Sequence, residues 1–241
     1  MDEWPLGLLL RDVAHGRFPE PDGTVRVLPA VAAGEALVAA VLAFTAHTVI
    51  VADLPAAEIQ AQLDPEDFGA PMSVPFLAWL AARSGGEPGV LDAVLVRFGA
   101  GTAGDAPLPP ERGVTLVERP DLTSHPRAAR ALALRREVTI YADPDERGVV
   151  MLGRGVAGRR EISYEVAPEH RGAGLGRALL AAALARVPPD EPVFAQASPG
   201  NAMSLRSILA AGFRPAGSEL LFERRVRGSG FLPGGRSGPS H

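Results

Sequence analysis

A cluster of glycines in the C-terminal half of the chain has the spacing of an anion-binding turn. Three glycines, Gly172, Gly174 and Gly176, are followed at once by an apolar, helix-forming segment. A strand-like segment that ends at Val166 precedes them. Glycines let a backbone approach a ligand closely, and the free N–H groups at a helix N-terminus attract phosphate oxygens. With Arg171 beside them as a cation, these residues predict a seat for a pyrophosphate.

The same glycines permit two other interpretations. A dinucleotide-binding fingerprint needs Gly-x-Gly-x-x-Gly, but Arg177 stands where the third glycine belongs. No acidic residue ends a second strand at the distance that this fingerprint requires. A glycine-rich turn from strand to helix that binds no ligand is the other interpretation. The residues that flank the glycines carry further information.

These flanking residues resemble the GNAT superfamily of acyl-CoA-dependent N-acetyltransferases. The family hallmark is Arg/Gln-x-x-Gly-x-Gly/Ala after a strand that ends in Val-x-Pro. Arg171, Gly174 and Gly176 fill the hallmark positions. Val166 and Pro168 fill the end of the strand. The resemblance covers about residues 113–224.

A second family signature is an Asn that opens a short helix ending in Gly-Phe. Asn201, the only Asn in the chain, is followed by such a segment, which ends at Gly212 and Phe213. The resemblance implies an α/β protein with a GNAT-type mixed, splayed β-sheet flanked by helices. It also implies acetyl-CoA as acyl donor and, as acceptor, a primary amine of a small molecule or peptide that attacks the thioester directly.

The resemblance implies a role for each matching residue. Val166 would pair its backbone with the pantetheine arm and offer its N–H to the thioester oxygen. Asn201 would contact the cofactor near its thiol end, and Ser204 lies one helical turn further along the same face. The pyrophosphate would be held by Arg171 and by the backbone of Gly172, Ala173, Gly174, Leu175 and Gly176.

Attack of an amine on a thioester also needs a proton acceptor and a stabilised oxyanion. In this family the N–H of Val166 would stabilise the developing negative charge. Glu161 and Glu165 share one face of the strand before the glycines, so either is a candidate base, directly or through water. Solvated strand residues or ion-pair partners are the alternative interpretation of both.

One position departs from the family pattern. Many members carry a Tyr seven residues after the helix-opening Asn, where it protonates the leaving thiolate, and here that position is Ile208. A thiol of pKa about 8.5 leaves near neutral pH without much help. Ser204, one turn before Ile208, and Tyr164 are other candidate donors. A non-catalytic acyl-CoA-binding or regulatory module is therefore the alternative function.

The elements that must position these residues follow from hydrophobic periodicity and turn residues. In residues 111–226, the GNAT-like domain, strands are expected at 114–118, 137–142, 148–156, 161–166 and 192–197. Helices are expected at about 121–136, 175–187 and 201–211, and a final hairpin at 213–224. The Gly-, Ser- and Pro-rich segment 227–241 is predicted to be a disordered tail.

Residues 1–110 are predicted to form a smaller α/β unit, and the Gly- and Pro-rich segment 99–112 marks its boundary. Strands are expected at 24–28, 44–52 and 91–98, and helices at 56–63 and 76–83. This strand, helix, helix, strand order permits a degenerate relative of the GNAT fold that shapes the acceptor pocket.

Composition excludes several kinds of chemistry. The 241 residues include no Cys and no Lys, and all 24 basic residues are Arg. Disulfides, thiolate metal sites, a cysteine nucleophile, a Walker phosphate loop and Schiff-base chemistry are therefore absent. His15, His47 and His125 lie far apart, so no metal site is expected, and His47 fits a buried core position.

Charge and hydrophobicity bear on partners and location. A net charge of -4 with dispersed arginines argues against nucleic acid as a partner. The apolar run 36–52 is interrupted by Thr45, His47 and Thr48 and lacks a basic flank, which favours a core strand over a membrane span. No signal peptide is recognised. The composition is typical of a GC-rich bacterial genome, and we expect a cytoplasmic protein.

Overall fold

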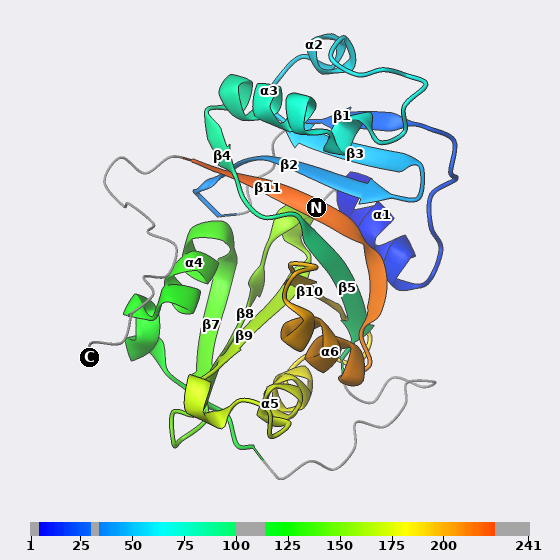
Figure 1. Cartoon of the computed structure of the whole chain (residues 1–241). Helices are drawn as coiled ribbons and strands as arrows, with labels where there is room; N and C mark the ends of the chain where they lie inside the picture. Colours follow the sequence, from blue (N-terminus) through cyan, green and yellow to red (C-terminus); the bar gives the residue numbers. More distant parts are fainter. Residues whose placement is uncertain (1–4, 30–33, 100–113, 225–241) are drawn as a thin grey trace, which may run out of the picture.

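The computed structural model describes residues 5–29, 34–99 and 114–224. Within them, the chain forms one 11-stranded mixed sheet with helices on both faces (Figure 1). The predicted α/β class, a mixed sheet flanked by helices, is confirmed. Most of the predicted boundary segment at 99–112, and the whole predicted tail at 227–241, lie outside the described residues.

The order of strands in the sheet interleaves the two halves of the sequence. β11 lies between β2 and β5, and β5 lies between β11 and β10. Strands from before and after residue 110 therefore share one sheet. The full order is β1 (Val25–Leu28), β3 (His47–Ala52), β2 (Leu37–Phe44), β11 (Arg214–Arg224), β5 (Asp92–Phe98), β10 (Pro192–Ala197), β9 (Arg160–Val166), β8 (Gly148–Arg154), β7 (Arg136–Ala142) and β6 (Val117–Glu118), with β4 (Gly86–Pro88) pairing with β11.

Alternating apolar residues let helices cover both faces of this sheet. In β8, Val149 and Met151 belong to the core cluster under α4, whereas Val150 and Leu152 belong to the cluster under α5. α2, α3, α5 and α6 cover one face, and α1 and α4 cover the other. The helices span α1 (Pro5–Ala14), α2 (Ala56–Gln60), α3 (Val74–Ser84), α4 (Pro126–Leu134), α5 (Leu175–Leu184) and α6 (Ala202–Ala210).

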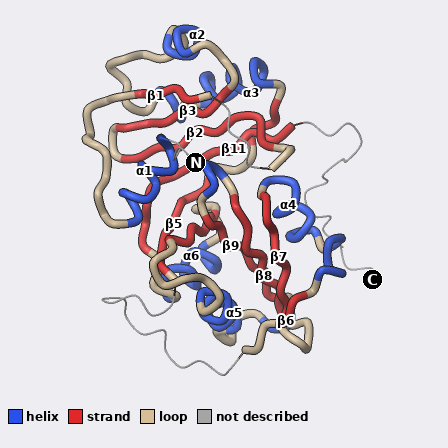
Figure 2. The backbone as a smooth tube through the Cα atoms, turned by 180° about the vertical axis from the view of Figure 1, so that it is seen from behind, coloured by secondary structure: helices blue, strands red, loops and turns tan. Residues whose placement is uncertain are grey.

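The figures show these layers. In Figure 1, α2 and α3 lie over β1, β3 and β2 at the top of the view, and α5 and α6 lie at the bottom. Figure 2, drawn from behind, shows α1 in front of the sheet. Apolar side chains of α1 belong to one buried cluster with Leu42, Val94 and Phe194, which come from three strands far apart in the sequence. The apolar core therefore continues across the sheet.

Capping residues explain where two of the helices begin and end. The Ser73 hydroxyl oxygen accepts a hydrogen bond from the Phe76 N–H at the start of α3, and Gly85 ends this helix in a left-handed conformation. At the start of α6, the Asn201 side-chain oxygen accepts from the Ser204 N–H at 3.1 Å. The predicted helices at these places are confirmed.

Several elements differ from the expectations. The strand expected at 44–52 begins later, at His47, and is β3. The earlier part of the apolar run 36–52 forms β2, which was not expected, and the two strands make a hairpin that turns near Ala46 at a φ of 46°. The segment 213–224 is not a hairpin but the single strand β11, because its Pro-Ala-Gly sequence forms an irregularity in the pairing with β5 instead of a turn. α1 has no counterpart among the predicted elements.

Two further observations concern the described part of the chain. Its helices all fall short of the length and hydrophobicity needed to cross a lipid bilayer. No group of three or more His, Asp or Glu side chains in it is suited to hold a metal ion. His47 is buried, as expected, with its Nδ1 atom 3.4 Å from an Asp22 carboxylate oxygen.

Candidate functional site

Two adjacent parallel strands, β9 and β10, separate toward their C-terminal ends. They pair over three residues, and the last pair joins Ala195 to Ile162. Beyond that pair, β9 continues to Val166 and β10 continues to Ala197 without pairing with each other. An opening therefore forms in the middle of the sheet. The sequence resemblance implied a splayed sheet, and the sheet is splayed between β9 and β10.

The backbone of β9 presents groups without a strand partner to this opening. The Ala167 N–H donates to the Arg147 carbonyl oxygen, and the Gly155 N–H donates to that of Arg159, so the odd-numbered residues of β9 bond to β8. Successive residues of a strand direct their N–H and C=O groups to opposite sides. The backbone groups of Tyr164 and Val166 therefore face the opening, where no strand among the described residues pairs with them.

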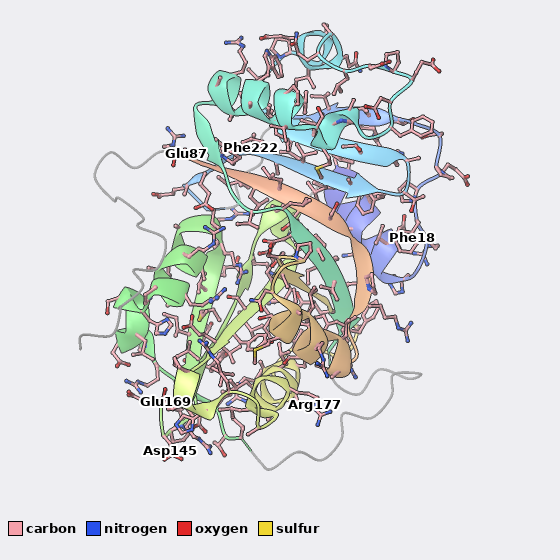
Figure 3. The ribbon with its side chains drawn as sticks, in the orientation of Figure 1. Phe18, Glu87, Asp145, Glu169, Arg177 and Phe222 are labelled. Atoms are coloured by element: carbon pink, nitrogen blue, oxygen red, sulfur yellow. The ribbon has the colours of Figure 1, made fainter. Side chains whose placement is uncertain are left out.

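The glycine turn lies at the end of β9 and leads into α5. Gly172 and Gly174 have φ values of 83° and 81°, a left-handed conformation that glycine adopts without strain. Gly174 is the residue just before α5, so the first N–H groups of the helix have no partner within the helix. Figure 3 shows Glu169 and Arg177, which precede and follow this turn, at the same end of the molecule.

A cavity of about 510 Å³ connects the opening between the strands with the glycine turn and α6. It brings together nine of the eleven predicted site residues. Ala173 and Glu161 are the two that do not line it. The predicted residues that do are Glu165, Val166, Arg171, Gly172, Gly174, Leu175, Gly176, Asn201 and Ser204.

Tyr164 reaches across this cavity from β9 to α6. Its ring packs against Gly176, where a Cβ atom would lie only 2.9 Å from the ring carbon Cε2. Its hydroxyl donates to the Ser204 carbonyl oxygen at 3.5 Å. Burial raises the pKa of Tyr164 above its usual 10, although hydrogen bonds to Ser207 and Ser204 act against this. The phenol is therefore protonated throughout the neutral range.

The two predicted carboxylates have different surroundings. Glu165 lines the cavity, is 37% exposed, and pairs with Arg127 of α4 at 3.3 Å. Glu161 is buried, and each of its oxygens lies 2.7 Å from a guanidinium, that of Arg135 or of Arg159. Burial by itself raises the pKa of Glu161, but the Arg159 and Arg135 charges outweigh it and hold this pKa below its usual value. Glu161 is thus an ion-pair partner inside the protein.

Ile208 occupies the position at which the family pattern has a Tyr. Its side chain is buried in the apolar core under α5 and α6, and it does not line the cavity. Ser204, one turn earlier, does line the cavity. The structure therefore offers Tyr164 and Ser204 as hydroxyl groups near the opening.

Several cavity residues were not among the sequence candidates. Ser207 lies one turn beyond Ser204, so helical spacing gave a signal for it. Arg127 comes from α4, far away in the sequence, and only the fold places it at the cavity. The remaining lining residues are His170, Met203 and Arg206.

Comparison with known proteins gives matches among solved structures alone. No protein-family model and no curated protein matches the sequence. The chain is similar to a GCN5-related N-acetyltransferase from Kribbella flavida, with 16% identity and a TM-score of 0.41, over 63% of this chain and 65% of that one. It is also similar to an acetyltransferase from the GNAT family from Colwellia psychrerythraea, with 11% identity and a TM-score of 0.38, over 62% and 61% of the two chains.

A third match is a functionally unknown conserved protein from Staphylococcus epidermidis, with 16% identity and a TM-score of 0.40, over 64% of this chain and 68% of that one. The chain thus spans less than two thirds of the first two structures. Similarities at this level do not by themselves give this chain an activity. What they establish is that its structure is similar, over about 60% of its length, to structures described as GNAT acetyltransferases.

Proposed function

We propose that this protein is an N-acetyltransferase that uses acetyl-CoA to acetylate a primary amine of a small molecule or peptide. The observation that carries the proposal is the opening between β9 and β10, which continues into a glycine turn at the N-terminus of α5. Acetyl-CoA combines a pyrophosphate with an arm that contains two amides. A helix N-terminus suits the first part, and unpaired strand backbone suits the second.

The residues present fit such a donor. The turn from Gly172 to Gly176 and the Arg171 side chain would hold the pyrophosphate, with open space at both left-handed glycines. The backbone groups of Tyr164 and Val166 would bond to the amides of the arm. When bound, acetyl-CoA supplies an activated acyl group on sulfur.

The chain's own residues would supply orientation and proton transfer. The Val166 N–H faces the opening and can donate to a developing oxyanion. The Tyr164 hydroxyl is protonated and lies beside α6, so it can donate a proton to a leaving thiolate in place of the missing Tyr at position 208. Asn201 and Ser204 border the same space, and Glu165 connects it with solvent and can pass a proton outward.

A non-catalytic acyl-CoA-binding or regulatory module is the second candidate function. The burial of Ile208 in the core favours it, because α6 carries no Tyr in the place of the proton donor found in many family members. The two candidates make the same prediction for acetyl-CoA binding. They differ in whether CoA is released.

Release of CoA can be measured with unusual clarity, because the chain has no Cys. A thiol-reactive dye would report only free CoA, which we would follow with acetyl-CoA and a panel of amines and amino acids. Release that depends on both protein and amine supports the enzyme. A melting temperature that rises with acetyl-CoA, without release for any amine, favours the non-catalytic module. If acetyl-CoA neither binds nor is converted to free CoA, both candidate functions are contradicted.

A further inference from the structure

A second, smaller cavity lies on the opposite face of the sheet from α5 and α6. Its volume is about 80 Å³, and it lies beside α4. Its polar lining includes Asp92 of β5, Ser163 of β9, Gln196 of β10, and Arg127 and Arg130 of α4. A water molecule occupies about 30 Å³ of liquid volume, so the space suits a group of two or three heavy atoms.

Two polar groups in this cavity lack partners. The Gln196 Nε2 atom is fully buried and has no hydrogen-bond partner among the described residues. Asp92 is half-buried and forms neither a hydrogen bond nor an ion pair with any described residue. A buried polar group without a partner destabilises a folded protein. A cavity with one unpaired donor and one unpaired carboxylate is therefore suited to a ligand that satisfies both.

Burial affects the protonation of Asp92. It raises the pKa of Asp92 above its usual 3.8, and the Arg130 and Arg127 charges offset this only in part. A carboxylate whose pKa moves toward neutrality accepts a proton more readily.

The other two carboxylates of the cavity already have cationic partners. Arg159 lies between them, at 2.7 Å from Glu161 and 2.6 Å from Glu219. Arg135 bonds to the second oxygen of Glu161. Asp92 pairs in register with Glu219 across β5 and β11, but it has no such guanidinium bonded to it. It is therefore the carboxylate of this cavity that is open to a ligand.

The second cavity lies close to the larger one. Arg127 lines both cavities. Ser163 lines the smaller cavity and Glu165 the larger, and these two residues lie next to each other on one face of β9. Gln196 lies on β10, one residue beyond its last pair with β9. A group in the smaller cavity would thus lie near the place where β9 and β10 separate.

We propose that the smaller cavity binds the amine end of the acceptor, with Asp92 as the carboxylate partner and proton acceptor of the amino group, and Gln196 as a positioning residue whose Nε2 donates to an oxygen of the acceptor. The inference rests on the proposed function. In the reaction, the amine nitrogen forms a bond to the acyl carbon while the carbon–sulfur bond breaks. The ammonium group loses two protons on the way to the amide: one passes to Asp92 before the attack, and the second passes to solvent water once the bond to carbon has formed. The thiolate that leaves takes a proton from water, or from Tyr164, which then regains one from water.

The rim of the cavity indicates what else the acceptor carries. Arg127 and Arg130 lie one helical turn apart on α4, and their side chains are 42% and 51% exposed. Their partners, Glu165 and Glu223, form exposed or partly exposed ion pairs, which contribute little and exchange readily. An acceptor with an anionic group close to its amine would satisfy these two cations. The acceptor class is therefore an amino-acid-like amine rather than a simple alkylamine or a polyamine.

The test compares acceptors and variants in the full chain. We would measure CoA release with matched pairs, each an amino acid and the amine that lacks its carboxylate, for example phenylalanine and phenethylamine, extended to all common amino acids. Asp92→Asn keeps the shape of the side chain but removes its charge. Asp145→Asn is the matched control, because Asp145 is 75% exposed in the turn between β7 and β8 (Figure 3). The rise in melting temperature with acetyl-CoA is recorded for each variant.

We expect at least one amino acid to be acetylated with a kcat/KM about tenfold or more above that of its paired amine. Asp92→Asn should lower this kcat/KM at least about a hundredfold, while the rise in melting temperature with acetyl-CoA stays unchanged. Asp145→Asn should change neither the kcat/KM nor this rise. A preference for the uncharged amines, full activity of Asp92→Asn, or no release with any amino acid would overturn the proposal. If acetyl-CoA still raises the melting temperature in these cases, only the acceptor site is refuted and the donor site stands. If acetyl-CoA does not raise the melting temperature either, the proposed function itself fails.

Discussion

The Nε atom of Arg171 lies 3.1 Å from the carbonyl oxygen of Val166. The side chain that the sequence assigns to the pyrophosphate thus bonds to the backbone group that faces the opening between β9 and β10. In the proposed complex the two groups would separate, because the guanidinium would bind phosphate oxygens and the carbonyl oxygen would accept from the pantetheine arm. In the structure, this hydrogen bond connects the predicted pyrophosphate seat with the opening between the strands.

Replacement of Arg171 should weaken donor binding without loss of fold. Arg171→Gln removes a charge from a cavity that holds a polyanion, so we expect the Kd for acetyl-CoA to rise about tenfold at low salt. The difference from the unmodified protein should shrink as salt is added, because salt screens exposed charges. Calorimetry at two salt concentrations measures both effects. Arg136→Gln, an exposed change at the start of β7, is the control, and an equal effect there would refute a specific role for Arg171.

Tyr164 should affect turnover more than binding. Tyr164→Phe keeps the ring that packs against Gly176 but removes the hydroxyl, so we expect kcat to fall about tenfold, with an unchanged acetyl-CoA-dependent melting shift. The loss is smaller than that for many general acids because a thiolate leaves readily. Since burial raises the pKa of Tyr164, the ratio of kcat for the unmodified protein to kcat for Tyr164→Phe should be constant from pH 7 to about 9. Equal kcat values for the two proteins would show that water, and not Tyr164, protonates the leaving thiolate.

Gly155 tests the buried ion pairs around Glu161. A Cβ atom at this position would lie 2.1 Å from the Glu161 Oε1 atom, which Arg159 and Arg135 hold in place through the carboxylate. Gly155→Ala should therefore lower the free energy of unfolding by about 2 kcal/mol in urea denaturation. Gly7→Ala in α1, where the nearest atom is at an ordinary 3.5 Å, should cause no such loss. A stable Gly155→Ala protein would show that this network moves freely.

Asp143 should make the stability of the folded protein depend in part on pH. Two hydrogen bonds from Arg147 hold the pKa of this buried carboxyl below its usual 3.8. A lowered folded-state pKa stabilises the protein above the unfolded-state pKa, and the contribution is lost as the pH falls through the folded-state pKa. Asp143→Asn should therefore lower the melting temperature by a few degrees at pH 7, and the difference should shrink below about pH 4. A difference that does not depend on pH would contradict this.

The sequence predicted most elements because local signals and tertiary structure agree there. The Ser73 cap, the Gly85 end of α3 and the strand from Pro192 to Ala197 all lie at the expected places. The hairpin at 36–52 was missed because a continuous apolar run hides a turn at Thr45 and Ala46. β11 was misjudged because Pro215 and Gly217, typical turn residues, form an irregularity inside a strand. Strand order was beyond reach, since no local signal places β11 between β2 and β5.

The residues of the candidate site also fall into those that the sequence could predict and those that only the fold brings together. Residues near each other in the sequence, from Val166 to Gly176 and from Asn201 to Ser204, could be predicted, and all but Ala173 of the residues assigned there line one cavity. Glu161 and Glu165 share a strand face as expected, but only the fold shows that two arginines hold Glu161. Arg127, Asp92 and Gln196 come from three separate elements. Their meeting depends on long-range pairing, which single-residue patterns do not encode.

Binding of acetyl-CoA to the glycine turn is the central claim, and calorimetric titration of acetyl-CoA into two matched glycine variants tests it most directly. Gly174→Glu and Gly85→Glu place the same side chain at left-handed positions with open space, but only the first lies at the cavity. We predict that the unmodified protein and Gly85→Glu bind acetyl-CoA with similar affinity, and that Gly174→Glu shows no binding because a carboxylate replaces the phosphate seat. Equal binding by both variants, or no binding by the unmodified protein at millimolar ligand, would contradict the account.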